Sequence, residues 1–143
     1  MADAGDIINV CDKFHGAIAD IIRLVREKRV DCPELERLEK IISLCKADSD
    51  EFLIERCKEK LWESRVQIKS KDDNYFMNEN FDRYIKKGSQ YADFQYDLMD
   101  IIRVGYPEFT EAEKARLWKI SNTMLKSACA YMLLKGDFNE QTD

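Results

Sequence analysis

Hydrophobic residues in the first segment of the chain recur at alternating intervals of four and three positions. The series is Ile7, Cys11, Phe14, Ile18, Ile21 and Val25. This spacing places the side chains on one face of an α-helix. Val10, Ala17 and Ile22 widen that face beyond the narrow seam of a two-stranded coiled coil. The pattern therefore predicts a helix from about Asp6 to Lys28 that packs within a bundle.

A second helix is predicted to begin at Asp31. Asp31, Pro33 and Glu34 supply an N-cap, an early-turn proline and the acidic residue of a capping box. The apolar face of this helix contains Leu35, Leu38, Ile42 and Cys45.

A third helix is predicted to follow the segment ADSDE at residues 47–51. Asp48, with Glu51 three residues later, resembles a second capping box. The apolar face of this helix contains Leu53, Cys57 and Leu61, with Trp62 beside them. The segment SKDDN at residues 70–74 is expected to end it.

Three more helices are predicted in the second half. A short one begins in the stretch DDNYFMNENFDRYI at residues 72–85 and ends at Gly88. The next carries Tyr91, Phe94, Leu98, Ile101 and Ile102 on one face and stops near Gly105 and Pro107. The last opens on a capping box from Thr110 to Glu113 and stops at Gly136. Its apolar positions are Leu117, Trp118, Ser121, Met124, Leu125, Ala128, Tyr131 and Met132.

Composition and length agree with this pattern. The chain has 143 residues, 45% of them hydrophobic and 36% charged, with five glycines and two prolines, and this composition suits long helices better than turn-rich sheets. We predict an all-α fold, a compact bundle of about six helices with short loops. Residues 1–137 form a single domain in this prediction, and residues 138–143 a frayed C-terminal tail.

Charge and cysteine usage narrow the classes of function. The net charge is −5 and neither half of the chain is basic, which argues against direct nucleic-acid binding. The five cysteines are widely spaced and form no CxxC pair, so we expect reduced thiols in the cytosol or nucleus. Apolar runs are only a few residues long, far below the roughly 20 needed to span a bilayer. We therefore expect a soluble protein without membrane contact.

The stretch at residues 72–85 mixes oxygen-bearing side chains with aromatic rings, which raises the question of a calcium loop. An EF-hand loop starting at Asp72 would place Phe76, Met77 and Arg83 at positions 5, 6 and 12, and one starting at Asp48 would place Phe52 at position 5. Both patterns fail. The acidic and amide side chains here suit a helix cap better.

Aromatic residues are concentrated in the second half of the chain. They are Phe76, Phe81, Tyr84, Tyr91, Phe94, Tyr96, Tyr106, Phe109, Trp118 and Tyr131. A small domain does not easily bury so many large rings, and Tyr and Trp are enriched in interface hot spots. We expect an aromatic joint, meaning a contact between rings of neighbouring helices, and its candidate residues are Phe76, Phe81, Tyr84 and Trp118. The sequence leaves open which of these rings pack in the core and which face a partner.

Asp93, Asp97 and Asp100 lie on one side of the fifth predicted helix. The Glu-x-x-His spacing of carboxylate-bridged metal bundles is missing here. A solvated face is favoured, with a docking strip for a basic partner as the alternative.

Two further patterns suggest chemistry only weakly. Cys11 and His15 are one helical turn apart, but no other Cys or His has a paired spacing, so Cys11 as a core residue is favoured over zinc binding or nucleophilic catalysis. Lys58, Arg65 and Lys69 share a side of the third predicted helix, where interleaved glutamates favour charge compensation. No glycine-rich phosphate loop occurs. We expect no enzyme activity, cofactor or metal.

Part of the chain resembles a known group of proteins. The segments DDNYFMNENF and PEFTEAEKARLWKISNTML, with the apolar helix SACAYMLL, resemble small helical proteins of large nucleocytoplasmic DNA viruses. In those proteins an Asp/Asn-rich turn with paired aromatics precedes a helix of the form E-x-x-K-x-x-x-W-K. The resemblance covers roughly residues 70–134 and depends on Asp73, Phe76, Asn78, Phe81, Lys114 and Trp118. It implies a virus-encoded protein of the infected cytoplasm or the virion, such as a minor capsid component.

These observations predict a non-enzymatic structural or protein-interaction protein. Its partners would be other proteins of a virion or of a host, and homo-oligomerisation is left open. The alternative is a regulatory adaptor in the cytosol or nucleus that binds a host protein or a nucleic-acid-processing protein.

Overall fold

The computed structural model describes residues 4–28, 33–72, 75, 98, 101–103 and 105–136. Its elements are α1 (Ala4–Lys28), α2 (Pro33–Asp48), α3 (Phe52–Glu63), α4 (Arg65–Ser70), the short 3-10 helix η2 (Tyr106–Glu108) and α7 (Glu111–Lys135). Leu98 and residues 101–103 are also helical, and no strand occurs among the described residues. The fold is all-α, a compact bundle of helices, as the sequence predicts.

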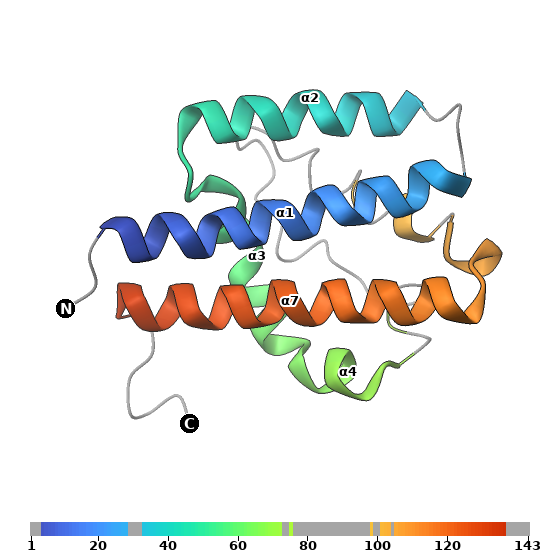
Figure 1. Ribbon diagram of the computed structural model, residues 1–143. Coiled ribbons are helices and arrows are strands. Elements are labelled where there is room, and N and C mark those ends of the chain that lie inside the picture. Colours follow the sequence, from blue (N-terminus) through green and yellow to red (C-terminus); the bar gives the residue numbers. More distant parts are fainter. Residues whose placement is uncertain are drawn as a thin grey trace.

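The centre of the bundle is the antiparallel pair of α1 and α7. These two helices run side by side along their whole lengths (Figure 1). The predicted apolar face of α1 is buried at every position from Cys11 to Val25, and Ile7 at its start is partly buried. On α7, Leu117, Ala128 and Tyr131 are fully buried. This pair forms most of the core because both helices present wide apolar faces along their length.

Helix α7 begins and ends as its sequence predicts. The Thr110 hydroxyl accepts a hydrogen bond from the Glu113 backbone N–H at 3.2 Å, and the Glu113 carboxylate accepts one from the Thr110 N–H at 2.8 Å. These reciprocal bonds form a complete capping box. Gly136 ends the helix with a φ of 73°, in the left-handed region that glycine adopts without steric cost. Both predicted boundaries are confirmed.

The predicted cap of the third helix is wrong. Asp48 belongs to the last turn of α2, and Glu51 makes no side-chain cap hydrogen bond. The Ser49 hydroxyl instead accepts the Glu51 backbone N–H at 3.1 Å. The Ser49 hydroxyl, two residues before Glu51, therefore stabilises the turn between α2 and α3, as short hydroxyl side chains commonly do.

The predicted continuous third helix is also divided at Ser64. The Ser64 N–H still bonds to the Lys60 carbonyl at 2.9 Å, but its φ and ψ of −92° and 8° bend the chain into α4. The Arg65 guanidinium bonds to the Trp62 carbonyl at 2.8 Å and lies over the Trp62 ring at 4.0 Å. Lys58 therefore does not share a helix with Arg65 and Lys69. Helix α4 ends at Lys71, within the segment predicted to end it.

Helix α2 lies on the other side of α1 from α7 (Figure 1). Leu35, Leu38 and Cys45 on α2 are buried, as predicted, while Ile42 is partly buried. The closest described neighbour of α2 is α3, which passes from the α2 side of the bundle toward α4. The wider separation of α2 from α1 leaves room for a pocket between these two helices.

Candidate functional site

Most of the predicted site residues lie outside the described part of the chain. These are Phe76, Phe81, Tyr84, Asp93, Asp97 and Asp100. Trp118 is described and is 3% exposed, so it belongs to the core. Its ring centroid lies 6.4 Å from that of Tyr75, a residue of the aromatic stretch. The other described members of the aromatic group, Tyr106, Phe109 and Tyr131, are buried as well.

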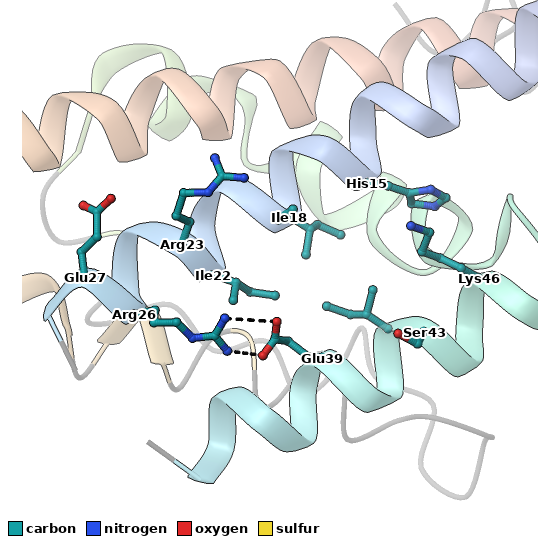
Figure 2. Close-up of a pocket in the computed structure, with 11 residues that line it drawn as sticks. His15, Ile18, Ile22, Arg23, Arg26, Glu27, Glu39, Ser43 and Lys46 are labelled. Atoms are coloured by element: carbon teal, nitrogen blue, oxygen red, sulfur yellow. Dashed lines mark hydrogen bonds and ion pairs between the residues drawn. The ribbon is translucent and has the colours of Figure 1, made fainter. Parts of the chain in front are cut away.

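A pocket of about 440 Å³ lies between α1 and α2. Its lining residues are His15, Ile18, Ala19, Ile22, Arg23, Arg26 and Glu27 from α1, and Glu39, Ile42, Ser43 and Lys46 from α2. In Figure 2, Ile18 and Ile22 lie between the two helices, whereas Arg23 and Glu27 extend from α1 away from α2. The volume falls in the range of small-ligand and side-chain pockets, and an apolar centre with polar groups around it is typical of binding sites.

An ion pair bridges the two helices at one end of the pocket. Arg26 near the end of α1 donates two hydrogen bonds to the Glu39 carboxylate on α2, one of them at 3.3 Å (Figure 2). The Glu39 carboxylate raises the pKa of the Arg26 guanidinium. Both side chains are about 45% exposed, so the pair contributes little to stability in water. The pair connects α1 to α2 across that end of the pocket.

The opposite end contains His15 and Lys46. His15 is 8% exposed, and its Nε2 is buried without a hydrogen-bond partner among the described residues. The Lys46 side chain from α2 extends toward the His15 ring (Figure 2). Burial and then the Lys46 ammonium lower the pKa of His15 from its usual value of 6.5, while Asp12 and Asp50 oppose that decrease. His15 is therefore neutral at pH 7.

Two further charged residues of the pocket, Arg23 and Glu27, are paired. The Arg23 guanidinium lies 2.8 Å from the Asp20 carboxylate, and Glu27 lies 3.6 Å from Arg116 on α7. Lys46, by contrast, makes no ion pair with any residue in the described part of the chain. Of the lining cations, the exposed Lys46 is therefore the one without an ion-pair partner in the part of the chain that the structure describes.

A second polar cluster joins α3 to the end of α7. The Tyr131 hydroxyl lies 2.6 Å from a Glu51 carboxylate oxygen and 2.5 Å from a Glu55 carboxylate oxygen. Lys135 lies 3.0 Å from Glu51, and Lys58 lies 2.8 Å from Glu55. Hydrogen bonds from Tyr131 and Lys135 lower the pKa of Glu51. Two carboxylates and two ammonium groups therefore surround one buried phenol.

The Tyr131 phenol is not suited to proton transfer or nucleophilic attack. Burial, followed by the two glutamates, raises its pKa far above the usual value of 10. Tyr131 is fully buried and does not line the 480 Å³ pocket next to Glu51 and Glu55. The cluster satisfies its own members and holds α3 and α7 together, so its role is structural.

The buried thiols among the described residues are held in unreactive form. Cys11 is fully buried, which confirms it as a core residue, and burial followed by Glu51 raises its pKa to about 11. Burial also raises the pKa of Cys45 to about 11 and that of Cys57 to about 12. A nucleophilic thiol needs the opposite shift. Among the described residues no group of three or more His, Cys, Asp or Glu side chains is arranged to hold a metal ion.

Within the described ranges, no helix is both long enough and apolar enough to cross a membrane. Comparison of the chain with protein-family models, curated proteins and solved structures finds no match. The resemblance to helical proteins of large DNA viruses therefore stays a prediction.

The sequence does not predict the pocket between α1 and α2, and the reason is physical. The apolar pattern places Ile18, Ile22 and Ile42 on apolar faces, and the spacing pairs His15 only with Cys11. A pocket forms where two helices stand apart, and the separation of two helices does not appear in the periodicity of either. The one available signal was a histidine beside an apolar face, with a lysine near the end of the next helix.

Proposed function

We propose that this chain is a non-enzymatic binding protein that works through protein contacts, with the pocket between α1 and α2 as its anchor site. The observation that carries the proposal is the pocket itself. It has an apolar centre of Ile18, Ile22 and Ile42 and a volume of about 440 Å³. Interface hot spots are side chains that fill pockets of this kind and exclude water.

The state of the polar side chains supports a binding role over catalysis. The buried thiols and the Tyr131 phenol keep their protons at neutral pH because burial raises their pKa values. The pocket contains a neutral histidine and one lysine beside aliphatic side chains. Such a set can orient a partner, whereas general acid–base work needs a group that titrates near the working pH and a second group to orient it.

Photo-crosslinking tests this proposal. We expect a photoreactive amino acid at Ser43, which is exposed and lines the pocket, to form a discrete protein adduct in the native source. The same residue at Thr123, exposed on α7, is the control and should give no such adduct. Adducts of equal yield and identity at both positions would contradict an anchor role for the pocket.

A filling substitution gives a second arm of that experiment. Ala19→Trp adds a large side chain to an exposed pocket position and should reduce the Ser43 adduct at least about tenfold. Ala115→Trp on the exposed face of α7 is the matched control, because it adds the same ring away from the pocket. An unchanged adduct in Ala19→Trp would reject the pocket as the contact site.

The setting of this binding role is a further part of the proposal. The resemblance over residues 70–134 supports a minor structural component of a virion, and the adaptor role is the alternative. Affinity purification from the native source with mass spectrometry separates the two. Virion proteins among the specific partners would support the first, and host regulatory or nucleic-acid-processing proteins the second.

A further inference from the structure

His15 has an unusual position for a polar side chain. It is 8% exposed, and its Nε2 has no partner among the described residues. Leaving a buried polar atom unpaired costs free energy, on the order of 1–3 kcal/mol, so native proteins seldom do so without compensation. A bound hydrogen-bond donor would remove this cost while the ring is neutral, and a bound acceptor would remove it once the ring is protonated.

Lys46 supplies the second polar group at the same place. Its side chain points toward the His15 ring from the facing helix (Figure 2). It makes no ion pair within the described ranges, although other cations of the pocket do. Among the described residues, a buried nitrogen without a partner and an exposed ammonium without a counter-ion therefore lie at one end of the pocket.

The charges decide which anion suits this end. Asp20 already holds Arg23, and Glu39 holds Arg26, so among the described residues Lys46 is the lining cation without an ion-pair partner, although Asp12 and Asp50 also act on His15. A carboxylate carries one negative charge. A phosphate monoester carries about −1.5 to −2 at pH 7 and would remain largely unbalanced here. The aliphatic side chains of Ile18, Ile22 and Ile42 then require apolar groups beside the anion.

We propose that the His15–Lys46 end of the pocket binds the carboxylate of an aspartate or glutamate in a partner protein, with neighbouring aliphatic side chains of that partner on Ile18, Ile22 and Ile42. This inference rests on the proposed function and states which side chains the partner segment bound in the pocket must contain. The carboxylate accepts hydrogen bonds from the Lys46 ammonium and, once His15 is protonated, from its Nε2–H.

Binding of the carboxylate is coupled to protonation of His15. The groups that act on His15 are Lys46 from α2, Asp12 from its own helix, and Asp50 with its backbone from the turn before α3. In the free protein the pKa of His15 lies below 6.5. A bound carboxylate favours the charged ring and raises that pKa. Affinity is therefore greatest at low pH and declines as pH rises from the free to the bound pKa.

NMR of His15 tests the inference directly, because it is the only histidine in the chain. The probes are the peptide N-acetyl-Leu-Glu-Leu-amide and its glutamine counterpart. We expect the glutamate peptide to shift the His15 ring resonances in a saturable way and to raise the His15 pKa. The glutamine peptide should bind about fivefold more weakly. Equal binding of the two peptides would overturn the proposal.

Substitution of Lys46 provides the matched control. Lys46→Met keeps a long side chain and removes the charge, so it should weaken the glutamate peptide about fivefold and leave the glutamine peptide unchanged. It should also raise the His15 pKa of the free protein, since the ammonium lowers it. Lys119→Met, on the exposed surface of α7, should change neither. Unchanged glutamate-peptide affinity in Lys46→Met would overturn the assignment.

Octanoate serves as a probe for a different source of the carboxylate. Tighter binding of octanoate than of the glutamate peptide would show that the pocket takes a free aliphatic acid and would reject a protein segment.

The outcomes also separate the two proposals. A protein adduct at Ser43 without selectivity for the glutamate peptide rejects this inference and leaves the proposed function standing. Peptide selectivity without an adduct rejects the proposed function alone.

Discussion

Tyr131 and His15 are both buried polar side chains on the two central helices, yet their surroundings differ. The Tyr131 hydroxyl has two carboxylate partners within 2.6 Å, and those carboxylates have lysine partners. His15 Nε2 has no partner among the described residues, and the neighbouring Lys46 has no counter-ion there. A polar group with its partners in place stabilises the fold, whereas one without them is available to a ligand. The contrast supports a structural role for the Tyr131 cluster and is the basis of the proposed binding role for the His15–Lys46 end of the pocket.

The largest expected effect comes from removing the Tyr131 hydroxyl. Tyr131→Phe keeps the ring in the core and deletes the donor shared by Glu51 and Glu55. Hydrogen bonds to charged groups contribute roughly 1.5–3 kcal/mol, so we expect the free energy of unfolding to fall by about 2 kcal/mol. Urea unfolding at pH 7 measures it. A change below about 0.5 kcal/mol would remove the contrast with His15.

High pH should act on the same cluster. The pKa of Tyr131 is raised in the folded state, so its contribution is fully present below the ordinary pKa of 10 and is lost as pH rises above it. Once the unfolded state has lost the phenolic proton, stability should fall by about 1.4 kcal/mol per pH unit for this group. Cys11, whose pKa is about 11, should add a similar decline from pH 9.

The control for the alkaline experiment is Tyr131→Phe, which has no phenol to titrate at position 131. Urea unfolding of both proteins from pH 8 to 11 should show a smaller decline above pH 10 in the variant. Parallel declines in the two proteins would mean that Tyr131 does not carry the alkaline loss.

Glu51 should show a smaller effect with the opposite pH dependence. Its pKa is lowered by Tyr131 and Lys135, so its contribution is present above the ordinary value of 4.5 and is lost as pH falls through the folded pKa. The Glu51 side chain is about 35% exposed, and solvent weakens the pair. We expect Glu51→Gln to cost under about 1 kcal/mol at pH 7 and almost nothing at pH 3. Equal costs at both values would contradict the assignment.

The smallest effect is expected at His15. Because Nε2 is buried without a described partner, His15→Leu removes a desolvated polar atom and breaks no hydrogen bond at that nitrogen. The loss of any ring contact to the Asp50 backbone offsets part of the gain. We expect a change within about 0.5 kcal/mol by urea unfolding, with loss of selectivity for the glutamate peptide. Destabilisation as large as that of Tyr131→Phe would show that His15 is a structural residue.

The sequence predicted the helices where their signals are local. The capping box at Thr110 and Glu113, the stop at Gly136 and the apolar face of α1 involve residues within one or two turns of each other. The failures at Asp48 and Ser64 also have local causes. Ser49 takes over the turn before α3, and the contacts of Arg65 with Trp62 accompany a bend that apolar periodicity does not reveal.

The candidate site depended on contacts that are distant in sequence. The Tyr131 hydroxyl bonds to carboxylates 80 and 76 residues away, and the sequence marked Tyr131 only as an apolar position. His15 and Lys46 come from different helices, and their meeting depends on how far α2 stands from α1. Of the residues chosen from the sequence, Trp118 is described and lies in the core. The others lie outside the described residues, so the aromatic joint stays a prediction.

The most direct test of the pocket as a binding site is a pH titration of the His15 ring resonances with and without the glutamate peptide. The account predicts a pKa below 6.5 in the free protein and a higher pKa in the complex, with a much smaller change for the glutamine peptide. A free-protein pKa below 6.5 that the glutamate peptide leaves unchanged at saturating concentration would contradict the assignment of the His15–Lys46 end as a carboxylate site.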